Sequence, residues 1–279
     1  MQKRYNTDLL PSNFLLQWFS HKYWDYQNET IFVKYYKSYL KQFPQYTRNS
    51  YDLRLKPVID IINNKNDINL LEIGSGCGTE ALYFSMLGCS VTGVEFQKQM
   101  VDVALKRKYI LEDKLNNALD CNFINQSILD YDKDKKFDII WMEETFHHLE
   151  PRELIIDKIT SLLKPGGYLI ISETNYLNIM IQVKYFIIRG FRTTYTQCDD
   201  SGRKHIIGHE RILRAKKLAS HFEKKNIDII NIRYYRLLPN IFKQNNFYTI
   251  INEQFNKIIP SFIKKFLAIQ YNYVGKLNN

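Results

Sequence analysis

The sequence predicts an α/β fold built on a doubly wound, mostly parallel sheet, and three observations support this prediction. The 279 residues are 45% hydrophobic, which is enough to bury one large core or two modest ones and excludes disorder or a small disulfide scaffold. Between about residues 57 and 173, short apolar runs alternate with amphipathic stretches, a pattern typical of parallel strands joined by crossover helices. A glycine-rich stretch separates the first of these apolar runs from the first amphipathic stretch.

The strands and helices of this middle block are predicted from the spacing of its apolar residues. Apolar runs bounded by turn residues predict strands, and apolar residues three or four apart predict helices. We predict strands at 68–73, 90–95, 121–124, 137–142 and 168–173. We predict helices at 79–87, 97–108 and 151–163, the last with Pro151 in its first turn and with Gly166 and Gly167 as a stop and a turn after it.

The patterns on both sides of this block are weaker. Residues 1–56 are crowded with aromatic side chains, several at helical spacing, and predict a helical N-terminal cap. Among them are Phe14, Trp18, Phe19, Tyr23, Trp24, Tyr26, Phe32, Tyr35, Tyr36 and Tyr39. The remainder, residues 57–279, predicts one domain. It has a core at 68–173, an insertion at 174–213, and C-terminal strands and helices at 214–279, including a helix at 214–224 and strands at 227–237 and 269–274.

The cysteines and the apolar runs limit the cellular setting. Cys77, Cys89, Cys121 and Cys198 form no CxxC pair and have no Cys/His ligand spacing, so we expect reduced thiols and no metal. No uncharged apolar run reaches the length of a signal peptide core or a membrane span. We therefore expect a cytoplasmic protein that is at most peripheral to a membrane.

The positive charge is concentrated near the C-terminus. Residues 1–179 hold 21 Lys and Arg against 23 Asp and Glu, whereas residues 180–279 hold 18 against 6. This excess favours an anionic partner, such as a phosphorylated substrate, nucleic acid or acidic lipid. The alternative is a solvated basic surface. The segment 242–266 also has two interpretations. It could lie on an anionic membrane, or it could pack on the sheet, and Pro260 interrupts its apolar face.

The glycine-rich loop indicates a ligand site. Gly74, Gly76 and Gly78 follow the first strand in LEIGSGCGTE, where the missing Cβ atoms let a ligand approach backbone amides at a helix N-terminus. The dinucleotide pattern GxGxxG would need its third glycine one residue later, at Thr79. This spacing argues against NAD. We expect Cys77, between two of the glycines, to be a small filler rather than a reactive thiol.

The pattern E-x-G-x-G-x-G after the first strand resembles motif I of the class I S-adenosylmethionine-dependent methyltransferases. The resemblance implies a Rossmann-like sheet of seven strands and S-adenosylmethionine as cofactor. It also implies that the three glycines cradle the cofactor, that Glu72 helps to hold its methionine end, and that Glu95 accepts hydrogen bonds from both ribose hydroxyls. Phe96, the residue after that acid, would pack against the adenine.

The run FDIIWMEETFHHLEPRELIIDKITSLLKPGGYLIISE, residues 137–173, is similar to the family's fourth strand, fourth helix and fifth strand. In it, Glu143 would line the cofactor pocket. One position departs from the family pattern, because Ser127 stands where many members have an acid that binds the adenine amino group. The resemblance then implies that adenine is held mainly by the Ile128 backbone and apolar neighbours.

Methyl transfer to a hydroxyl requires a base, and the residues after the fourth strand include candidates. The cofactor supplies an activated methyl group, so the protein must chiefly align the reactants and, for a hydroxyl, remove a proton. Glu144, His147 and His148 follow the strand, and the two histidines are equal candidates, with a loop-anchoring role as the alternative. His205 and His209 belong either to a cover over the acceptor or to a turn in which Glu210 stabilises the start of the next helix.

The acceptor is indicated only by class. WMEE stands where base-methylating members of the family have NPPY or DPPY, so the resemblance implies a small-molecule, glycan or lipid-linked acceptor methylated at oxygen. One alternative is an RNA methyltransferase that uses the basic C-terminal third. Another is a protein that binds S-adenosylmethionine without turnover. The sequence does not indicate the oligomeric state.

Overall fold

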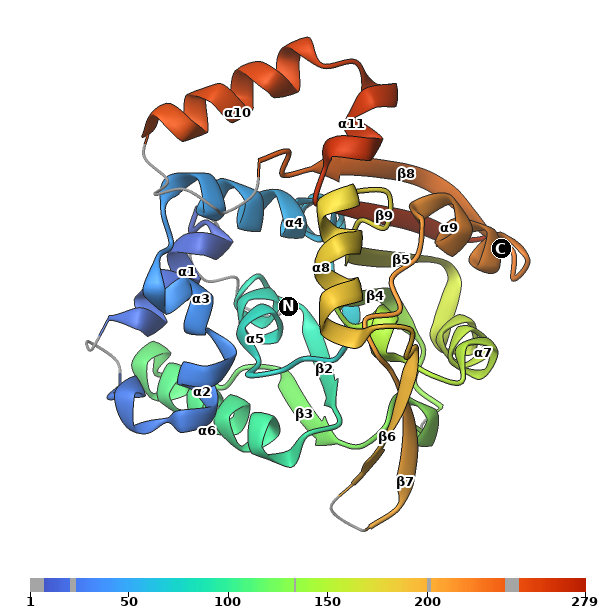
Figure 1. Ribbon diagram of the computed structural model, residues 1–279. Helices are drawn as coiled ribbons and strands as arrows, with labels where there is room; N and C mark the ends of the chain where they lie inside the picture. Colours follow the sequence, from blue (N-terminus) through green and yellow to red (C-terminus); the bar gives the residue numbers. More distant parts are fainter. Residues whose placement is uncertain (1–7, 21–23, 133, 200–201, 239–245) are drawn as a thin grey trace. The chain divides into compact units, whose positions relative to one another are not determined.

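The computed structural model (Figure 1) describes residues 8–20, 24–132, 134–199, 202–238 and 246–279. Its contacts divide the chain into an N-terminal unit, Met1–Trp141, and a C-terminal unit, Met142–Asn279. Helix α4 (Gln45–Asn63) runs through the predicted boundary between residues 56 and 57, and that division stays a prediction. Tyr23 and Phe242, which the sequence singled out, lie outside the described residues.

Seven strands form the central sheet in the order β3-β2-β1-β4-β5-β9-β8. Strand β1 pairs in parallel with β2 and β4, and β2 pairs in parallel with β3, whereas β9 is antiparallel to both β5 and β8. The predicted α/β fold with a seven-stranded, mostly parallel sheet is confirmed. The strands are β1 (Asn69–Ile73), β2 (Ser90–Glu95), β3 (Cys121–Asn125), β4 (Phe137–Glu143), β5 (Leu163–Thr174), β8 (Ile227–Tyr235) and β9 (Gln270–Leu277).

Two predicted details are wrong. Strand β5 begins at Leu163, directly after the preceding helix, so Gly166 and Gly167 lie inside an extended segment rather than in a stop and a turn. Gly166 has φ +71°, which shows that glycine is used there for its backbone freedom within the strand. The helix predicted to end at residue 108 continues to residue 115, because Leu111 extends its buried face.

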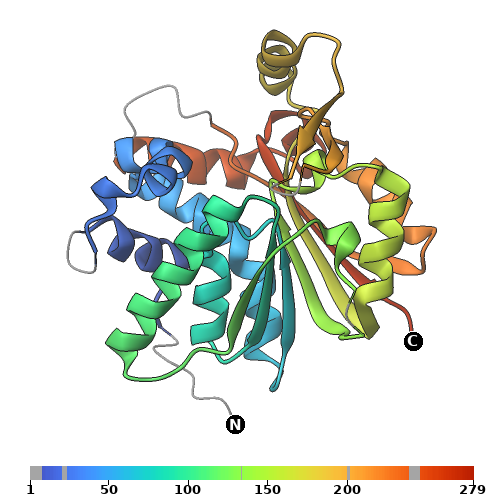
Figure 2. The ribbon, with the colours of Figure 1, turned by 90° about the horizontal axis from the view of Figure 1, so that it is seen from below.

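The N-terminal unit packs short helices around an aromatic core. Helix α1 lies against α4 and α5, and α2 lies against α6. Phe14, Trp18, Phe32 and Tyr36 are buried between these helices, as their helical spacing predicts. Helices α5 and α6 pack along strands β2 and β3, which Figure 2 shows in teal and green. The helices are α1 (Pro11–Phe19), α2 (Thr30–Tyr35), α3 (Lys37–Lys41), α5 (Thr79–Met86) and α6 (Lys98–Leu115), with short 3-10 turns η1 (Tyr26–Asn28) and η2 (Ile128–Asp130).

The C-terminal unit adds the predicted insertion to the other half of the sheet. Helix α9 packs on β8 and β9, where the rings of Phe222 and Tyr273 stack 6.0 Å apart. The insertion consists of helix α8 and a two-stranded hairpin. The elements are η3 (Phe146–His148), α7 (Arg152–Leu162), α8 (Ile179–Arg189), β6 (Thr194–Cys198), β7 (Lys204–Gly208), α9 (Ala215–Glu223), α10 (Asn246–Ile258) and α11 (Ser261–Leu267). Pro151 caps α7 instead of occupying its first turn.

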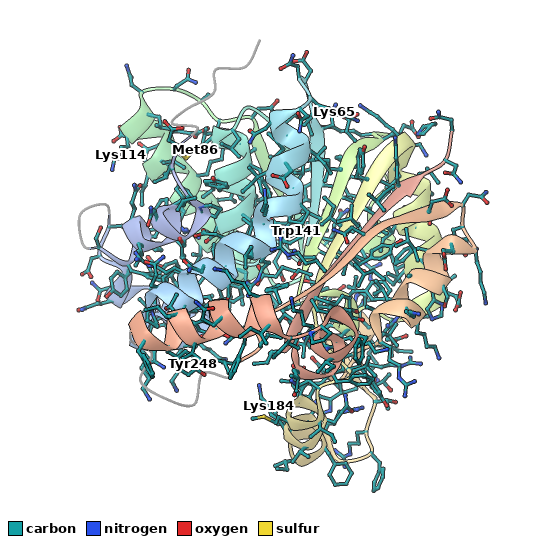
Figure 3. The ribbon with its side chains drawn as sticks, turned by 90° about the horizontal axis from the view of Figure 1, so that it is seen from above. Lys65, Met86, Lys114, Trp141, Lys184 and Tyr248 are labelled. Carbon is teal, nitrogen blue, oxygen red and sulfur yellow. The ribbon has the colours of Figure 1, made fainter. Side chains whose placement is uncertain are left out.

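The interior is densely filled, as Figure 3 shows around Trp141, whose side chain is fully buried. Lys184, on α8 and labelled in the same view, is exposed. No helix in the described part of the chain combines the length and the hydropathy that crossing a bilayer requires. The four cysteines are free thiols, and Cys198 alone among them is exposed.

Candidate active site

The glycine loop joins β1 to α5 and is held by backbone hydrogen bonds. The amides of Gly74 and Ser75 both donate to the Val94 carbonyl, at 2.8 and 3.2 Å, which fastens the loop to the end of β2. Gly74, Gly76 and Gly78 all have positive φ, between +50° and +77°. This left-handed backbone strains any residue with a Cβ, so the loop requires glycines at these positions.

Two of the glycines also allow close packing. A Cβ at Gly78 would lie 2.6 Å from the Phe123 ring and 2.8 Å from the Ala104 side chain. A Cβ at Gly76 would lie 2.6 Å from the Tyr35 hydroxyl. The loop is therefore packed against Tyr35 of helix α2, a contact that the sequence pattern alone does not indicate.

Glu95 ends β2 beside this loop, and its carboxylate is held by backbone amides. Gly76 N–H donates to one carboxylate oxygen at 3.0 Å, and Gln97 N–H donates to the other at 2.8 Å. Burial raises the pKa of Glu95, while these amides oppose the rise. Each oxygen keeps a second lone pair, so the carboxylate can still accept two hydroxyl groups.

Glu72 is a second buried carboxylate of the N-terminal unit. It lies on β1 with 3% of its surface exposed, and its Oε2 atom has no hydrogen-bond partner among the described residues. Burial raises its pKa well above the usual value, and the nearby Glu80 and Glu95 raise it further. A buried oxygen without a partner is costly, so this atom suits a ligand that brings a donor or a positive charge.

Arg107 holds the glycine loop in place through hydrogen bonds, a role that was not predicted from the sequence. Its side chain is fully buried, and Nη1 donates to the Cys77 carbonyl at 2.6 Å and to the Thr79 hydroxyl at 2.7 Å. Its guanidinium lies 4.3 Å from the centre of the Trp18 ring. The available signal was an arginine on the apolar face of a helix, since arginine is rarely buried without a partner.

The two residues predicted to hold adenine follow β3. Ser127 caps the turn η2, and its hydroxyl oxygen accepts the Leu129 amide at 3.3 Å, while Ile128 is buried. Phe96 is half-buried, and its carbonyl accepts Asn125 Nδ2 at 2.9 Å. The Ser127 side chain thus already has a structural task, and the roles of all three residues toward a cofactor stay predictions.

Cys77 lies inside the glycine loop with no exposed surface. Burial raises the pKa of its thiol to about 12, although the neighbouring Arg107 opposes the rise. A thiol with so high a pKa is not a nucleophile at neutral pH. This geometry supports the small filler role over a reactive one.

His147, in the C-terminal unit, forms a buried pair with Glu173. Its Nδ1 atom lies 2.6 Å from Glu173 Oε2 at the end of β5, and its Nε2 atom lies 3.6 Å from Glu210 Oε2. Burial alone would lower the pKa of His147, but Glu173, Glu144 and Glu210 together raise it to about 9. At neutral pH this histidine is therefore an imidazolium and cannot accept a proton.

His148 has the opposite character. Its Nδ1 atom lies 2.9 Å from the Gly208 carbonyl, which can only accept, so Nδ1 carries the hydrogen and Nε2 keeps its lone pair. Burial lowers the pKa of His148, and the positive His147 ring, whose centre lies 4.0 Å away, lowers it further. His148 is half-buried and neutral at pH 7. The structure thus separates two histidines that the sequence left equal.

The two acids after β4 differ in their contacts. Glu143 closes the strand and is half-buried, and its carbonyl accepts the Thr145 hydroxyl at 2.7 Å. Glu144 has φ +44°, and its carboxylate accepts Thr174 Oγ1 at 2.7 Å and Gln270 Nε2 at 2.8 Å. Glu144 is therefore tied to β5 and β9, while the expected cofactor role of Glu143 stays a prediction.

The insertion supports η3, called the histidine turn below, in a way that the sequence did not predict. Gly208 packs so closely that a Cβ there would lie 2.3 Å from the His147 carbonyl oxygen. Glu210 does not stabilise a helix start, as one alternative proposed, because α9 begins only at Ala215 and the Glu210 carboxylate faces His147. His205 pairs with Asp199 inside the hairpin, at 2.8 Å.

Glu173 is the main residue that sequence reasoning left without a role. The available signal was an acid at the end of β5, since the carboxyl ends of parallel strands share one edge of a sheet. Possible ligand atoms of His147, His148, Glu144, Glu173 and Glu210 lie within 4.8 Å of one another in groups of three. The hydrogen bond between His147 and Glu173 accounts for this closeness, and we do not assign a metal to it.

The middle of the chain is similar to a known protein family. A family model described as a methyltransferase domain matches residues 71–169, which contain the glycine loop, Glu95 and the histidine turn. This match, over about a third of the chain, supports the resemblance to the class I methyltransferases that the sequence shows. Most of the residues that carried the resemblance, from Glu72 to the end of β4 and into β5, lie within the matched segment.

Two curated relatives are O-methyltransferases. The ubiquinone biosynthesis O-methyltransferase of Rickettsia bellii is 28% identical over 144 residues, 48% of this chain and 58% of the relative. The malonyl-[acyl-carrier protein] O-methyltransferase 2 of Ilyobacter polytropus is 26% identical over 134 residues, 47% of this chain and 49% of the relative. The chain thus spans about half the length of these relatives.

A solved structure shares the fold. The magnesium protoporphyrin IX methyltransferase of Synechocystis PCC 6803, solved with bound SAH, superposes with a TM-score of 0.56 at 14% identity. The match covers 91% of this chain and 97% of that chain.

Proposed function

We propose that the protein transfers a methyl group from S-adenosylmethionine to an oxygen of a small-molecule, glycan or lipid-linked acceptor. The observation that carries this proposal is the Glu95 carboxylate held against the Gly76 amide at the end of the glycine loop. This arrangement presents two acceptor oxygens beside a strand-to-helix turn, as a ribose diol requires. The names of the two curated relatives favour oxygen as the methylated atom.

The described residues of the N-terminal unit fit this cofactor. S-Adenosylmethionine supplies an activated methyl group on a positively charged sulfonium. The buried Oε2 atom of Glu72, which has no hydrogen-bond partner among the described residues, can accept from the donor groups of the methionine end. Both carboxylate oxygens of Glu95 can accept from the ribose hydroxyls. The three glycines give the loop its left-handed backbone, and the half-buried Phe96, with Ile128, offers apolar surface for adenine.

His148 is the proposed general base. Its neutral imidazole has a free lone pair on Nε2, whereas the hydrogen bond from Nδ1 to Gly208 fixes the ring. The proton taken from an acceptor hydroxyl would rest on Nε2 while the hydroxyl oxygen attacks the methyl group. His147, held by Glu173, is the proposed positioning residue, because it packs against His148 and keeps that ring neutral.

A peripheral membrane location is proposed as well, on the basis of helix α8. Ile179, Val183, Ile187 and Phe191 on and after this helix are between 57% and 91% exposed, and Tyr185 is its one buried residue. Residues 175–198 contain three basic residues and no acidic one. An amphipathic cationic helix of this kind binds anionic lipid surfaces.

The test is to incubate the purified protein with labelled S-adenosylmethionine and fractionated cell extract. The proposal expects label in a small-molecule or lipid-extractable fraction, lost in alkali if the product is a methyl ester and kept if it is an ether. Label that enters only RNA would instead support the alternative based on the basic C-terminal third. Binding of the cofactor with no labelled product in any fraction would support the alternative of a protein without turnover.

A further inference from the structure

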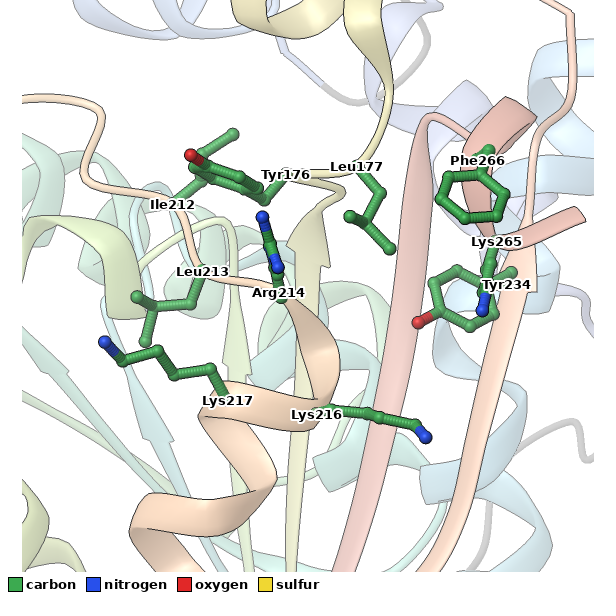
Figure 4. A pocket seen from close by; sticks show the side chains of 10 residues that line it. All are labelled: Tyr176, Leu177, Ile212, Leu213, Arg214, Lys216, Lys217, Tyr234, Lys265 and Phe266. Atoms are coloured by element: carbon green, nitrogen blue, oxygen red, sulfur yellow. The ribbon is translucent and has the colours of Figure 1, made fainter. Parts of the chain in front are cut away.

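The C-terminal unit contains a pocket of about 720 Å³ outside the histidine turn (Figure 4). It lies where the segment after β5, the start of α9, the end of β8 and helix α11 come together. Its size is within the range of small-molecule sites. The lining residues are Tyr176, Leu177, Ile212, Leu213, Arg214, Lys216, Lys217, Tyr234, Lys265 and Phe266.

The polar part of the lining has one sign of charge. Arg214, Lys216, Lys217 and Lys265 contribute four cations, and no carboxylate lines the pocket. Among the described residues none of the four has a carboxylate partner, although Arg214 lies over the Tyr176 ring at 5.4 Å. Four unpaired like charges around one cavity repel one another, so this arrangement favours an anion that binds between them.

The rest of the lining is apolar. Ile212 is 4% exposed and forms a wall with Leu177 and Leu213, while Phe266 is 50% exposed at the other side. In Figure 4 the rings of Tyr176 and Tyr234 lie on opposite sides of the pocket. An inorganic anion alone would leave this surface in contact with water, whereas an amphiphilic anion would cover it.

The pocket lies on the same face of the sheet as the His147–Glu173 pair. Glu173 on β5 stands directly opposite Tyr271 on β9, which in turn stands opposite the pocket residue Tyr234 on β8. Directly paired residues project to the same face, and neighbouring strands lie about 4.8 Å apart, so the backbones of Glu173 and Tyr234 are separated by roughly 10 Å. The Tyr271 hydroxyl also donates to the Leu213 carbonyl at 3.3 Å.

We propose that this pocket binds the phosphate-bearing end of an amphiphilic acceptor. The hydroxyl that is methylated belongs to this acceptor, and His148 removes its proton. The inference rests on the proposed function and specifies its substrate class. A phosphate monoester carries about two negative charges and a carboxylate only one, so phosphate or pyrophosphate matches four cations better. Arg214 adds the planar donor pair that suits phosphate oxygens.

The experiment measures binding of dodecyl phosphate, below its micelle concentration, by calorimetry at fixed ionic strength. Dodecyl maltoside, dodecanoate and inorganic phosphate are the comparison probes. We expect dodecyl phosphate to bind most tightly and the double variant Lys216→Gln, Lys217→Gln to lose about tenfold or more in affinity. Both lysines are exposed, so their removal leaves the core intact. Lys224→Gln, at the far end of α9 and outside the pocket, is the control for the loss of a single positive charge and keeps the affinity.

Several results would overturn the inference. One is equal affinity for dodecyl phosphate in the double variant and in the Lys224→Gln control. A second is that inorganic phosphate or dodecanoate binds the native protein as tightly as dodecyl phosphate does. A third is tighter binding of a single-stranded oligonucleotide at the same lysines. Titration with S-adenosylhomocysteine tests the proposed function separately. If that compound fails to bind while dodecyl phosphate binds at the lysines, the function fails and the pocket assignment stands.

Discussion

His147 and His148 are adjacent in sequence, yet their imidazoles carry different charges at neutral pH. Sequence could place both after β4 but could not separate them, because the deciding partners come from elsewhere in the chain. Glu173 lies 26 positions beyond His147, and the Gly208 carbonyl lies 60 positions beyond His148. The protonation states are therefore a product of tertiary contacts rather than of the local motif.

His148→Ala should lower kcat by about 10²- to 10⁴-fold, the usual contribution of a general base, with little change in cofactor affinity. Since burial lowers the pKa of His148, the rate of the native enzyme should stay high below pH 6.5 before it falls. Rate measurements from pH 5 to 9 check this. An unchanged kcat in His148→Ala would exclude His148 as the base.

Stability should depend on pH through His147. Its pKa in the folded protein is raised from the ordinary 6.5 to about 9, so its stabilising contribution is fully present below pH 6.5 and is lost as pH rises through about 9. The loss is on the order of 3 kcal/mol. Urea unfolding at several pH values measures it, and His147→Gln should remove most of the slope between pH 6.5 and 9. An equal slope in the variant would contradict the raised pKa.

Strands and helices were easier to predict than their supporting contacts. The hydrophobic patterns located β1, β2, β3 and β4 to within a residue or two, because a parallel strand that is buried, or half-buried at the edge like β3, leaves apolar residues at fixed positions in the sequence. The hairpin β6–β7 left no such signature, since most of its residues are exposed. Its role depends on Gly208, whose backbone contacts the histidine turn.

Gly208→Ala should displace the histidine turn. The added Cβ would meet the His147 carbonyl oxygen at 2.3 Å, and backbone cannot yield as a flexible side chain can. We expect a destabilisation of about 1 to 3 kcal/mol and a marked loss of kcat, with cofactor affinity kept. Thermal unfolding and calorimetry with S-adenosylhomocysteine check both. Retained stability and kcat would show that the hairpin does not support the turn.

The packing of α6 against the N-terminal helices should depend on Arg107. Arg107→Ala removes two hydrogen bonds to the glycine loop and a guanidinium between aromatic rings, so the unfolding free energy should fall by about 2 to 4 kcal/mol. Lys106→Ala is the control, because Lys106 forms an exposed ion pair with Glu29, and such pairs contribute about 0 to 1 kcal/mol. Equal losses in the two variants would show that Arg107 is not a buried anchor.

Across the chain, the sequence revealed the amount of charge but not its arrangement. The basic excess of residues 180–279 was countable, yet only the fold brings Lys265 of α11 to Arg214, Lys216 and Lys217 at the start of α9. The cofactor residues were predictable for the opposite reason. They lie in one short loop and at the end of the next strand, so their spacing in sequence already reflects their spacing in the fold.

The most direct test of the account is calorimetric titration of the native protein and of Glu95→Ala with S-adenosylhomocysteine and with NAD. We predict that S-adenosylhomocysteine binds the native protein and that Glu95→Ala weakens this binding by about 1 to 3 kcal/mol, roughly 5- to 150-fold, through loss of charged hydrogen bonds. We predict no binding of NAD to either protein. Binding of NAD without binding of S-adenosylhomocysteine, or an unchanged affinity in Glu95→Ala, would contradict the account.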